Sequence, residues 1–147
     1  MAMTATQKIK QHLLLQMVIA GDITLSGADS ESLSDPSKVD EIYDDLKSDD
    51  HSGLFSDYEN EFRTGQQETD IEPTHPFERG LTYYEKKSVA AQMPDGSWVG
   101  WIYWFGGGKH SDPEAIDWMG DAYFVNVEEK PVQIIQRTFT KVVTPCN

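Results

Sequence analysis

The sequence predicts an α+β fold in which N-terminal helices pack on a C-terminal antiparallel sheet of about four strands. Apolar residues recur at helical spacing up to about residue 72 and at strand spacing from residue 81 onward. A Pro94-Asp95-Gly96 turn separates two strand-like stretches, and the second of these, residues 97–105, is apolar on both faces. We expect the 147 residues to form one domain, with a helical, acidic part over 1–72 and a Trp-rich sheet part over 73–147.

The first predicted helix covers residues 4–20. Its apolar residues recur at spacings of three and four, Thr4 or Thr6 provides a cap, and Gly21 ends it. Residues 22–35 are rich in Asp, Ser and Gly without a sustained period, so this segment is predicted to be mainly loop.

A second helix is predicted from Asp35, a carboxylate cap, and Pro36, a residue favoured in the first helical turn. Its buried stripe and its acidic outer face are both clear: the stripe is Val39, Ile42, Tyr43 and Leu46, and the outer face is Asp40, Glu41, Asp44 and Asp45. A third helix is predicted over 53–62, and a polar segment from Gly65 to Pro76 is expected to cross to the sheet.

The sheet is predicted to consist of two hairpins with a short helix between them. Ser111, Asp112 and Pro113 provide the start signals of that helix, which is expected to end at Met119. The predicted strands are 81–93, 97–105, 121–127 and 132–143, and the last two are joined across residues 128–131.

The stretch from Trp98 to Phe105 is predicted to be a central strand. At a period of two, its residues form two apolar faces: Trp98, Gly100, Ile102 and Trp104 on one, and Val99, Trp101, Tyr103 and Phe105 on the other. A strand that is apolar on both faces is normally covered on both, so packed layers are expected on either side of it.

Charge is the strongest global feature of the sequence. The net charge of -13 argues against direct binding to nucleic acid phosphates or to anionic membrane surfaces. Cys146 is the only cysteine, so no disulfide forms within the chain, and a reducing cytoplasm is the simplest expected location. No apolar stretch approaches the roughly 20 residues that a membrane-spanning helix requires.

The negative charge is concentrated in one block of the chain. Residues 22–72 contain sixteen acidic and three basic residues, so this block carries thirteen net negative charges. Carboxylates on rigid helices can imitate the phosphates of a nucleic acid and occupy a basic groove, whereas a solvated acidic face that maintains solubility is the plainer interpretation. The predicted partner-binding residues are Asp40, Glu41, Asp44, Asp45, Asp49, Asp50, Asp57, Glu59 and Glu61.

A second possible ligand surface lies around the Trp-rich strand and the Gly106–His110 loop. The P-loop spacing is not met, because Tyr103 stands where a glycine is needed. Tryptophan faces can nevertheless stack on a ligand, and the predicted residues for such a surface are Trp101, Lys109 and His110. Core packing is the competing interpretation of the tryptophans.

The sequence indicates no enzyme, cofactor or metal site. The four histidines lack paired metal-binding spacing, the acidic run around Asp44–Asp50 does not match the EF-hand register, and no G-x-S-x-G motif is present. An alternative is that two of the three residues Glu85, Glu114 and Asp117 form a carboxylate pair of the kind that glycosidases use, but the sequence does not fix their separation.

The tract from Lys87 to His110, together with Glu114–Met119, resembles small uncharacterised proteins of phages and mobile elements, over roughly residues 75–143. This resemblance implies an inhibitor of host defence, such as an anti-CRISPR protein, acting in the host cytoplasm. The leading hypothesis is therefore a non-enzymatic acidic protein that docks on a basic, nucleic-acid-handling partner. The alternatives are a small-molecule or peptide-binding domain and a structural or assembly protein. The oligomeric state is left open.

Overall fold

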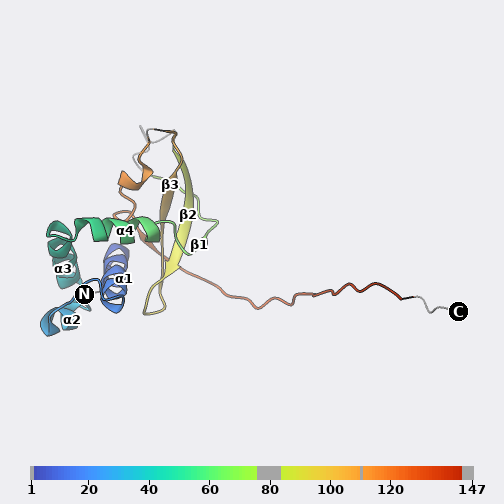
Figure 1. The fold of residues 1–147 in the computed structure, drawn as a ribbon, viewed down its shortest axis with the longest axis horizontal. Coiled ribbons are helices and arrows are strands. Elements are labelled where there is room, and N and C mark those ends of the chain that lie inside the picture. The colour runs from blue at the N-terminus through green and yellow to red at the C-terminus, as the bar shows by residue number, and fades with distance from the viewer. Residues whose placement is uncertain (1, 76–83, 110, 144–147) are drawn as a thin grey trace.

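A computed structural model of the chain describes residues 2–75, 84–109 and 111–143. Four α-helices precede a four-stranded antiparallel sheet, which confirms the predicted α+β class (Figure 1). The helices are α1 (Ala5–Ile19), α2 (Gly27–Ser32), α3 (Pro36–Ser48) and α4 (Ser52–Phe62). The strands are β1 (Gln67–Glu68), β2 (Glu85–Gln92), β3 (Trp98–Phe105) and β4 (Tyr123–Val125), with the short 3-10 helix η1 (Pro113–Ala115) before β4.

The predicted helix starts are confirmed by their caps. Thr4 accepts a hydrogen bond from the backbone N–H of Gln7, and the Gln7 side chain accepts one from the backbone N–H of Thr4, which completes a capping box at α1. Asp35 caps α3, and Pro36 occupies the first turn of that helix. The sequence analysis missed α2, a six-residue helix capped by Ser26, because none of its residues is buried and it therefore leaves no apolar period.

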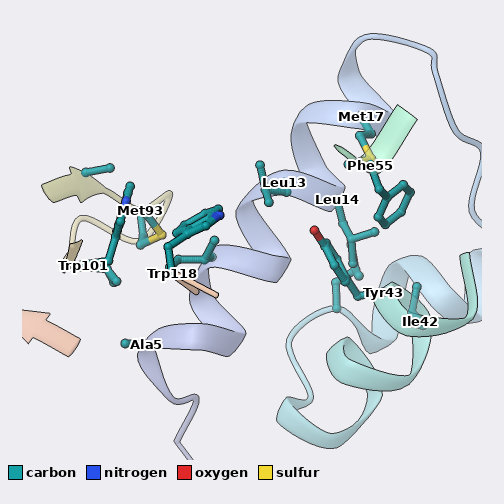
Figure 2. Close-up of a cluster of buried hydrophobic side chains, with 14 of the residues drawn as sticks. Ala5, Leu13, Leu14, Met17, Ile42, Tyr43, Phe55, Met93, Trp101 and Trp118 are labelled. Atoms are coloured by element: carbon teal, nitrogen blue, oxygen red, sulfur yellow. The ribbon is translucent and has the colours of Figure 1, made fainter. Parts of the chain in front are cut away.

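Helix α1 lies at the centre of the hydrophobic core (Figure 2). Trp101, Trp118 and Met93 lie on one side of it, and Tyr43 and Phe55 from the helical layer lie on the other. Its buried residues are Ala5, Ile9, Leu13, Leu14 and Met17. The helices and the sheet therefore share one core, and α1 connects the two layers.

The sheet has the strand order β1-β2-β3-β4, and every pair is antiparallel. The predicted turn joins β2 to β3: the Met93 N–H donates to the Ser97 carbonyl at 2.7 Å, and Gly96 has a φ of 89° that its lack of a side chain permits. Strand β3 is paired on both sides, as predicted for a central strand. Both faces are buried, since Trp101 is 0% exposed on the core side and Trp104 is 2% exposed on the other.

The composition of the sheet differs from the prediction at its two edges. The fourth strand is β1, whose residues Gln67 and Glu68 lie in the segment predicted to cross to the sheet. Residues 132–143 form no strand, so the predicted second hairpin is wrong. The predicted helix over 113–119 is also reduced to the single turn η1. The beginning of the predicted strand 81–93 lies outside the described residues up to position 83.

Candidate interaction surfaces

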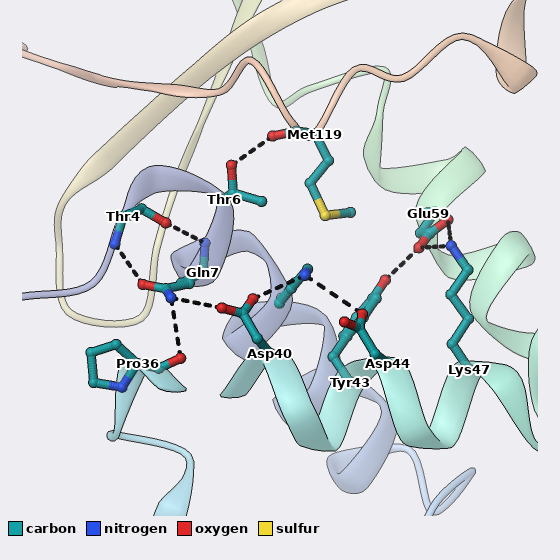
Figure 3. A network of polar contacts seen from close by, with 11 residues as sticks. Thr4, Thr6, Gln7, Pro36, Asp40, Tyr43, Asp44, Lys47, Glu59 and Met119 are labelled. Atoms are coloured by element: carbon teal, nitrogen blue, oxygen red, sulfur yellow. Dashed lines mark hydrogen bonds and ion pairs between the residues drawn. The ribbon is translucent and has the colours of Figure 1, made fainter. Parts of the chain in front are cut away.

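Part of the predicted acidic face is occupied by the protein's own cations (Figure 3). Lys10 of α1 donates to Asp40 of α3 at 2.9 Å and lies 3.6 Å from Asp44, while Gln7 donates to Asp40 at 2.8 Å. The side chain of Lys10 is only 17% exposed. These contacts attach α3 to α1, so Asp40 is engaged within the chain, whereas Asp44 pairs with Lys10 but keeps a side chain that is 67% exposed. The sequence pattern of α3 alone does not show that a lysine of another helix faces them.

Hydrogen bonding keeps Asp40 ionised. Burial is the largest single influence and favours the neutral acid, but the hydrogen bonds from Gln7 and Lys10, together with the charge of Lys10, outweigh it and lower the pKa of Asp40. The pair thus stabilises the folded state at neutral pH. This contribution is lost as the pH falls through the lowered pKa.

Glu59 is likewise an internal residue. It accepts hydrogen bonds from the Tyr43 hydroxyl at 2.6 Å and from Lys47 at 2.8 Å, and its side chain is 15% exposed (Figure 3). Burial, followed by the hydrogen bond to Glu59 and its negative charge, raises the pKa of Tyr43 well above its ordinary value. Glu59 therefore connects α4 to α3 and presents little of its carboxylate to a partner, unlike the exposed carboxylate that was predicted.

Five of the nine predicted partner-binding residues remain exposed and form no salt bridge with another described residue. We call these five the acidic rim: Asp45, Asp49, Asp50, Asp57 and Glu61. They lie on α3, on α4 and on the corner between these helices (Figure 1). Glu41 is exposed as well, but Lys38 lies 3.4 Å from it on the same helix, a surface pair of little energetic weight.

The predicted ligand surface around the Trp-rich strand is not formed. Trp101 is completely buried, its indole N–H donates to the Arg63 carbonyl at 2.8 Å, and its ring lies 5.2 Å from those of Phe62 and Trp118. Trp101 is thus a core residue, and its assignment to a ligand surface is wrong. Lys109 is exposed in the glycine loop, and His110 lies outside the described residues.

Arg63, which the sequence analysis did not single out, joins the helical layer to the sheet. Its guanidinium donates to the Trp104 carbonyl at 2.8 Å and lies 5.1 Å from the centre of the Tyr103 ring. The backbone carbonyl of Arg63 also accepts the hydrogen bond from the Trp101 indole N–H. Arg63 directly follows α4, and its side chain reaches β3. Because this contact depends on how α4 packs on the sheet, no local pattern in the sequence predicts it.

The segment after β4 is a second feature that sequence reasoning described incorrectly. Residues 126–143, which we call the arm, contain no helix or strand. They lead away from the rest of the described structure, which we call the body (Figure 1). The large apolar side chains of its outer part are 78–88% exposed: Val132, Ile134, Ile135, Phe139, Val142 and Val143. Residues 130–143 also contain three cations, Lys130, Arg137 and Lys141, and no acidic residue.

Neither a metal cluster nor a membrane-spanning helix is found in the described part of the chain. Across residues 2–75, 84–109 and 111–143, no three His, Cys, Asp or Glu residues are grouped so that they could hold a metal ion. None of the helices described is long and apolar enough to cross a membrane. Searches of protein-family models, curated proteins and solved structures find nothing that matches this chain. Function is therefore inferred from the residues and their contacts.

Proposed function

We propose that this protein is a non-enzymatic inhibitor that docks its acidic rim on a basic surface of a nucleic-acid-handling partner. One observation carries this proposal: the five rim carboxylates are exposed and form no salt bridge with a cation of the described chain. Like charges that are held near one another repel, and a cationic groove relieves this repulsion on binding. A phage anti-defence protein acting in the host cytoplasm, such as an anti-CRISPR protein, is the specific form of this proposal.

The internal ion pairs support the proposal in a different way from that predicted. Asp40 and Glu59 are engaged within the chain, and their contacts with Lys10 and Lys47 connect α3 to α1 and to α4. The rim is therefore carried by helices whose relative positions are fixed before binding. A preorganised charge pattern loses less conformational entropy on docking than a flexible acidic tail.

The experiment compares two variants with the same change in net charge. In the rim variant, Asp45, Asp49, Asp57 and Glu61 are each replaced by Lys. In the control variant, Asp29, Glu31, Asp70 and Glu72, which are also exposed, are each replaced by Lys. Native and variant chains are immobilised, bacterial lysate is passed over them at low and high salt, and the bound proteins are identified by mass spectrometry.

We expect the native chain and the control variant to capture the same DNA- or RNA-binding proteins, and a short DNA duplex to displace those proteins. The rim variant is expected to lose them, because charge-driven association depends on the local potential. Equal capture by the rim variant, or capture that duplex DNA does not affect, would contradict the proposal. Circular dichroism of all three proteins verifies that the substitutions leave the fold intact.

An assembly protein is the second candidate function, and the exposed apolar arm is the observation that favours it. Apolar side chains that are exposed over a continuous segment are typical of a surface that another chain covers. The small-molecule alternative has lost its main support, since Trp101 is buried.

A further inference from the structure

The outer arm, residues 130–143, has the composition of a strand but no strand partner within the described part of the chain. Seven of the twelve residues from Val132 to Val143 are Val, Ile or Thr, and Phe139 adds an aromatic ring. At about 3.3 Å per residue, the fourteen residues from 130 to 143 span roughly 45 Å when extended. Its backbone groups and six large apolar side chains are exposed.

A matching acceptor lies at the open edge of the sheet. Strand β4 pairs with β3 along one side through Trp98, Val99 and Gly100, and no described strand pairs with its other side. An unpaired edge offers N–H and C=O groups to an incoming strand. Phe124 in the middle of β4 is 53% exposed, and it lines a surface hollow with Trp98 and Val127.

The charges of the arm and of this edge are complementary. The outer arm carries three positive charges, whereas residues 1–129 contain nine basic and all 25 acidic residues and therefore carry sixteen net negative charges. Acidic residues also flank the edge itself, since Asp121 precedes β4 and Glu128 and Glu129 follow it, all exposed. The acidic edge of another copy of this chain thus attracts the arm.

The arm does not reach the edge of its own sheet, because that pairing requires a hairpin. The predicted turn over residues 128–131 is absent, and the segment after β4 continues away from the body (Figure 1). When a chain does not turn back to form a hairpin, the segment that would have been its second strand can pair with the same edge in another copy. This exchange is called domain swapping.

We propose that the outer arm pairs as a strand with the open edge of β4 in a second copy of this chain. If each arm binds the other copy, the interface is two-fold symmetric, and each four-stranded sheet gains a fifth strand from the other copy. The apolar side chains of the arm then cover Phe124 and the hollow beside Trp98. This inference is independent of the acidic rim, which lies on α3, on α4 and between them.

The test measures the molar mass of the full chain by light scattering from about 1 to 500 µM. The arm variant carries Ile134→Asn and Phe139→Asn, and a backbone variant carries Thr138→Pro, which removes no apolar side chain but blocks strand pairing. The matched control is Ile19→Asn, because Ile19 is also an apolar residue with 85% exposure but lies at the end of α1.

We expect the native chain and the Ile19→Asn control to reach twice the chain mass of 16.6 kDa. Both arm variants are expected to weaken the dimer at least tenfold. Hydrogen exchange identifies the surface: the amides of Phe124 and of residues 132–143 should become protected as the concentration rises. Because the substituted side chains of the outer arm are highly exposed, unchanged far-UV circular dichroism is expected for every variant.

Several results would overturn the inference. They are a native chain that stays monomeric across the whole range, a dimer that both arm variants leave intact, and arm amides that are protected equally at all concentrations. The last result would mean that the arm folds back on its own sheet. Pairing of the arm with an unrelated protein but never with a second copy would overturn it too. The rim variant should dimerise like the native chain, so failure of one proposal does not imply failure of the other.

Discussion

Strand β3 and the outer arm differ in their surroundings far more than in their composition. Both segments are rich in β-branched or aromatic residues and were predicted to be strands. Strand β3 pairs with β2 and β4, and its Trp101 is completely buried between α1 and the sheet. The outer arm has no partner in the described part of the chain, and its Phe139 is 88% exposed. Strand propensity is therefore realised only where a neighbouring strand and a covering layer are both present.

The largest expected effect of a substitution is at Trp101, the residue that best represents the buried segment. Replacing Trp101 with Ala removes the ring contacts with Phe62 and Trp118 and leaves the Arg63 carbonyl without its indole donor. We expect the free energy of unfolding to fall by about 3–5 kcal/mol. Urea denaturation measures this loss. Trp101→Phe should recover part of it, whereas a loss below about 1 kcal/mol would contradict the packing described here.

The second effect concerns the attachment of β4, which carries the arm. A Cβ atom at Gly100 would come within 2.8 Å of the Tyr123 ring and 2.9 Å of the Val125 side chain. Gly100→Ala is therefore expected to loosen β4 and to lower the free energy of unfolding by about 1–3 kcal/mol. Thermal denaturation and hydrogen exchange at β4 measure this effect. Gly27→Ala is the matched control, because nothing lies near that Cβ position, and an equal loss in both variants would contradict the steric cause.

A smaller effect on the free energy of unfolding depends on pH and arises from the body, not from the arm. Burial lowers the pKa of His12, whose ring lies 5.0 Å from that of Phe62. The unfolded chain then binds a proton more readily than the folded chain, so stability is complete above the ordinary pKa of 6.5 and decreases as the pH falls below it. His12 contributes at most about 1.4 kcal/mol per pH unit to the slope of the free energy of unfolding against pH.

Urea denaturation between pH 7.5 and 5 measures this decrease, and His12→Phe should remove it. A native chain with the same free energy of unfolding at both ends of this range would contradict the assignment. The residues from 130 to 143 include no His, Asp or Glu, so the arm itself adds no titration in this range.

The smallest expected effect is on the free energy of unfolding of arm variants at low protein concentration. Because the Phe139 side chain is 88% exposed, Phe139→Ala should change the stability of the monomer by less than about 0.5 kcal/mol. Denaturation at about 1 µM measures this value. Loss of more than 1 kcal/mol would mean that the arm packs on its own body, and the contrast between the two segments would then disappear.

Local signals in the sequence determined the main elements of the fold. The caps at Thr4 and Asp35, the turn at Pro94–Gly96 and the apolar faces of β3 depend on neighbouring residues, so the period and the chemistry of a short window are sufficient to predict them. The same signals failed for α2, which buries no residue, and for β1, whose two residues are too few to show a period.

The tertiary structure decided which polar residues are available and which strand has a partner. Whether a carboxylate is free to bind a partner depends on cations that are distant in the sequence. Lys10 donates a hydrogen bond to Asp40, thirty positions away, and Lys47 of α3 donates one to Glu59 of α4. Likewise, residues 132–143 have the composition of a strand but form none, because no described strand edge lies beside them. Pairing is a long-range property, so the sequence determined the propensity of each segment and the packing determined its neighbours.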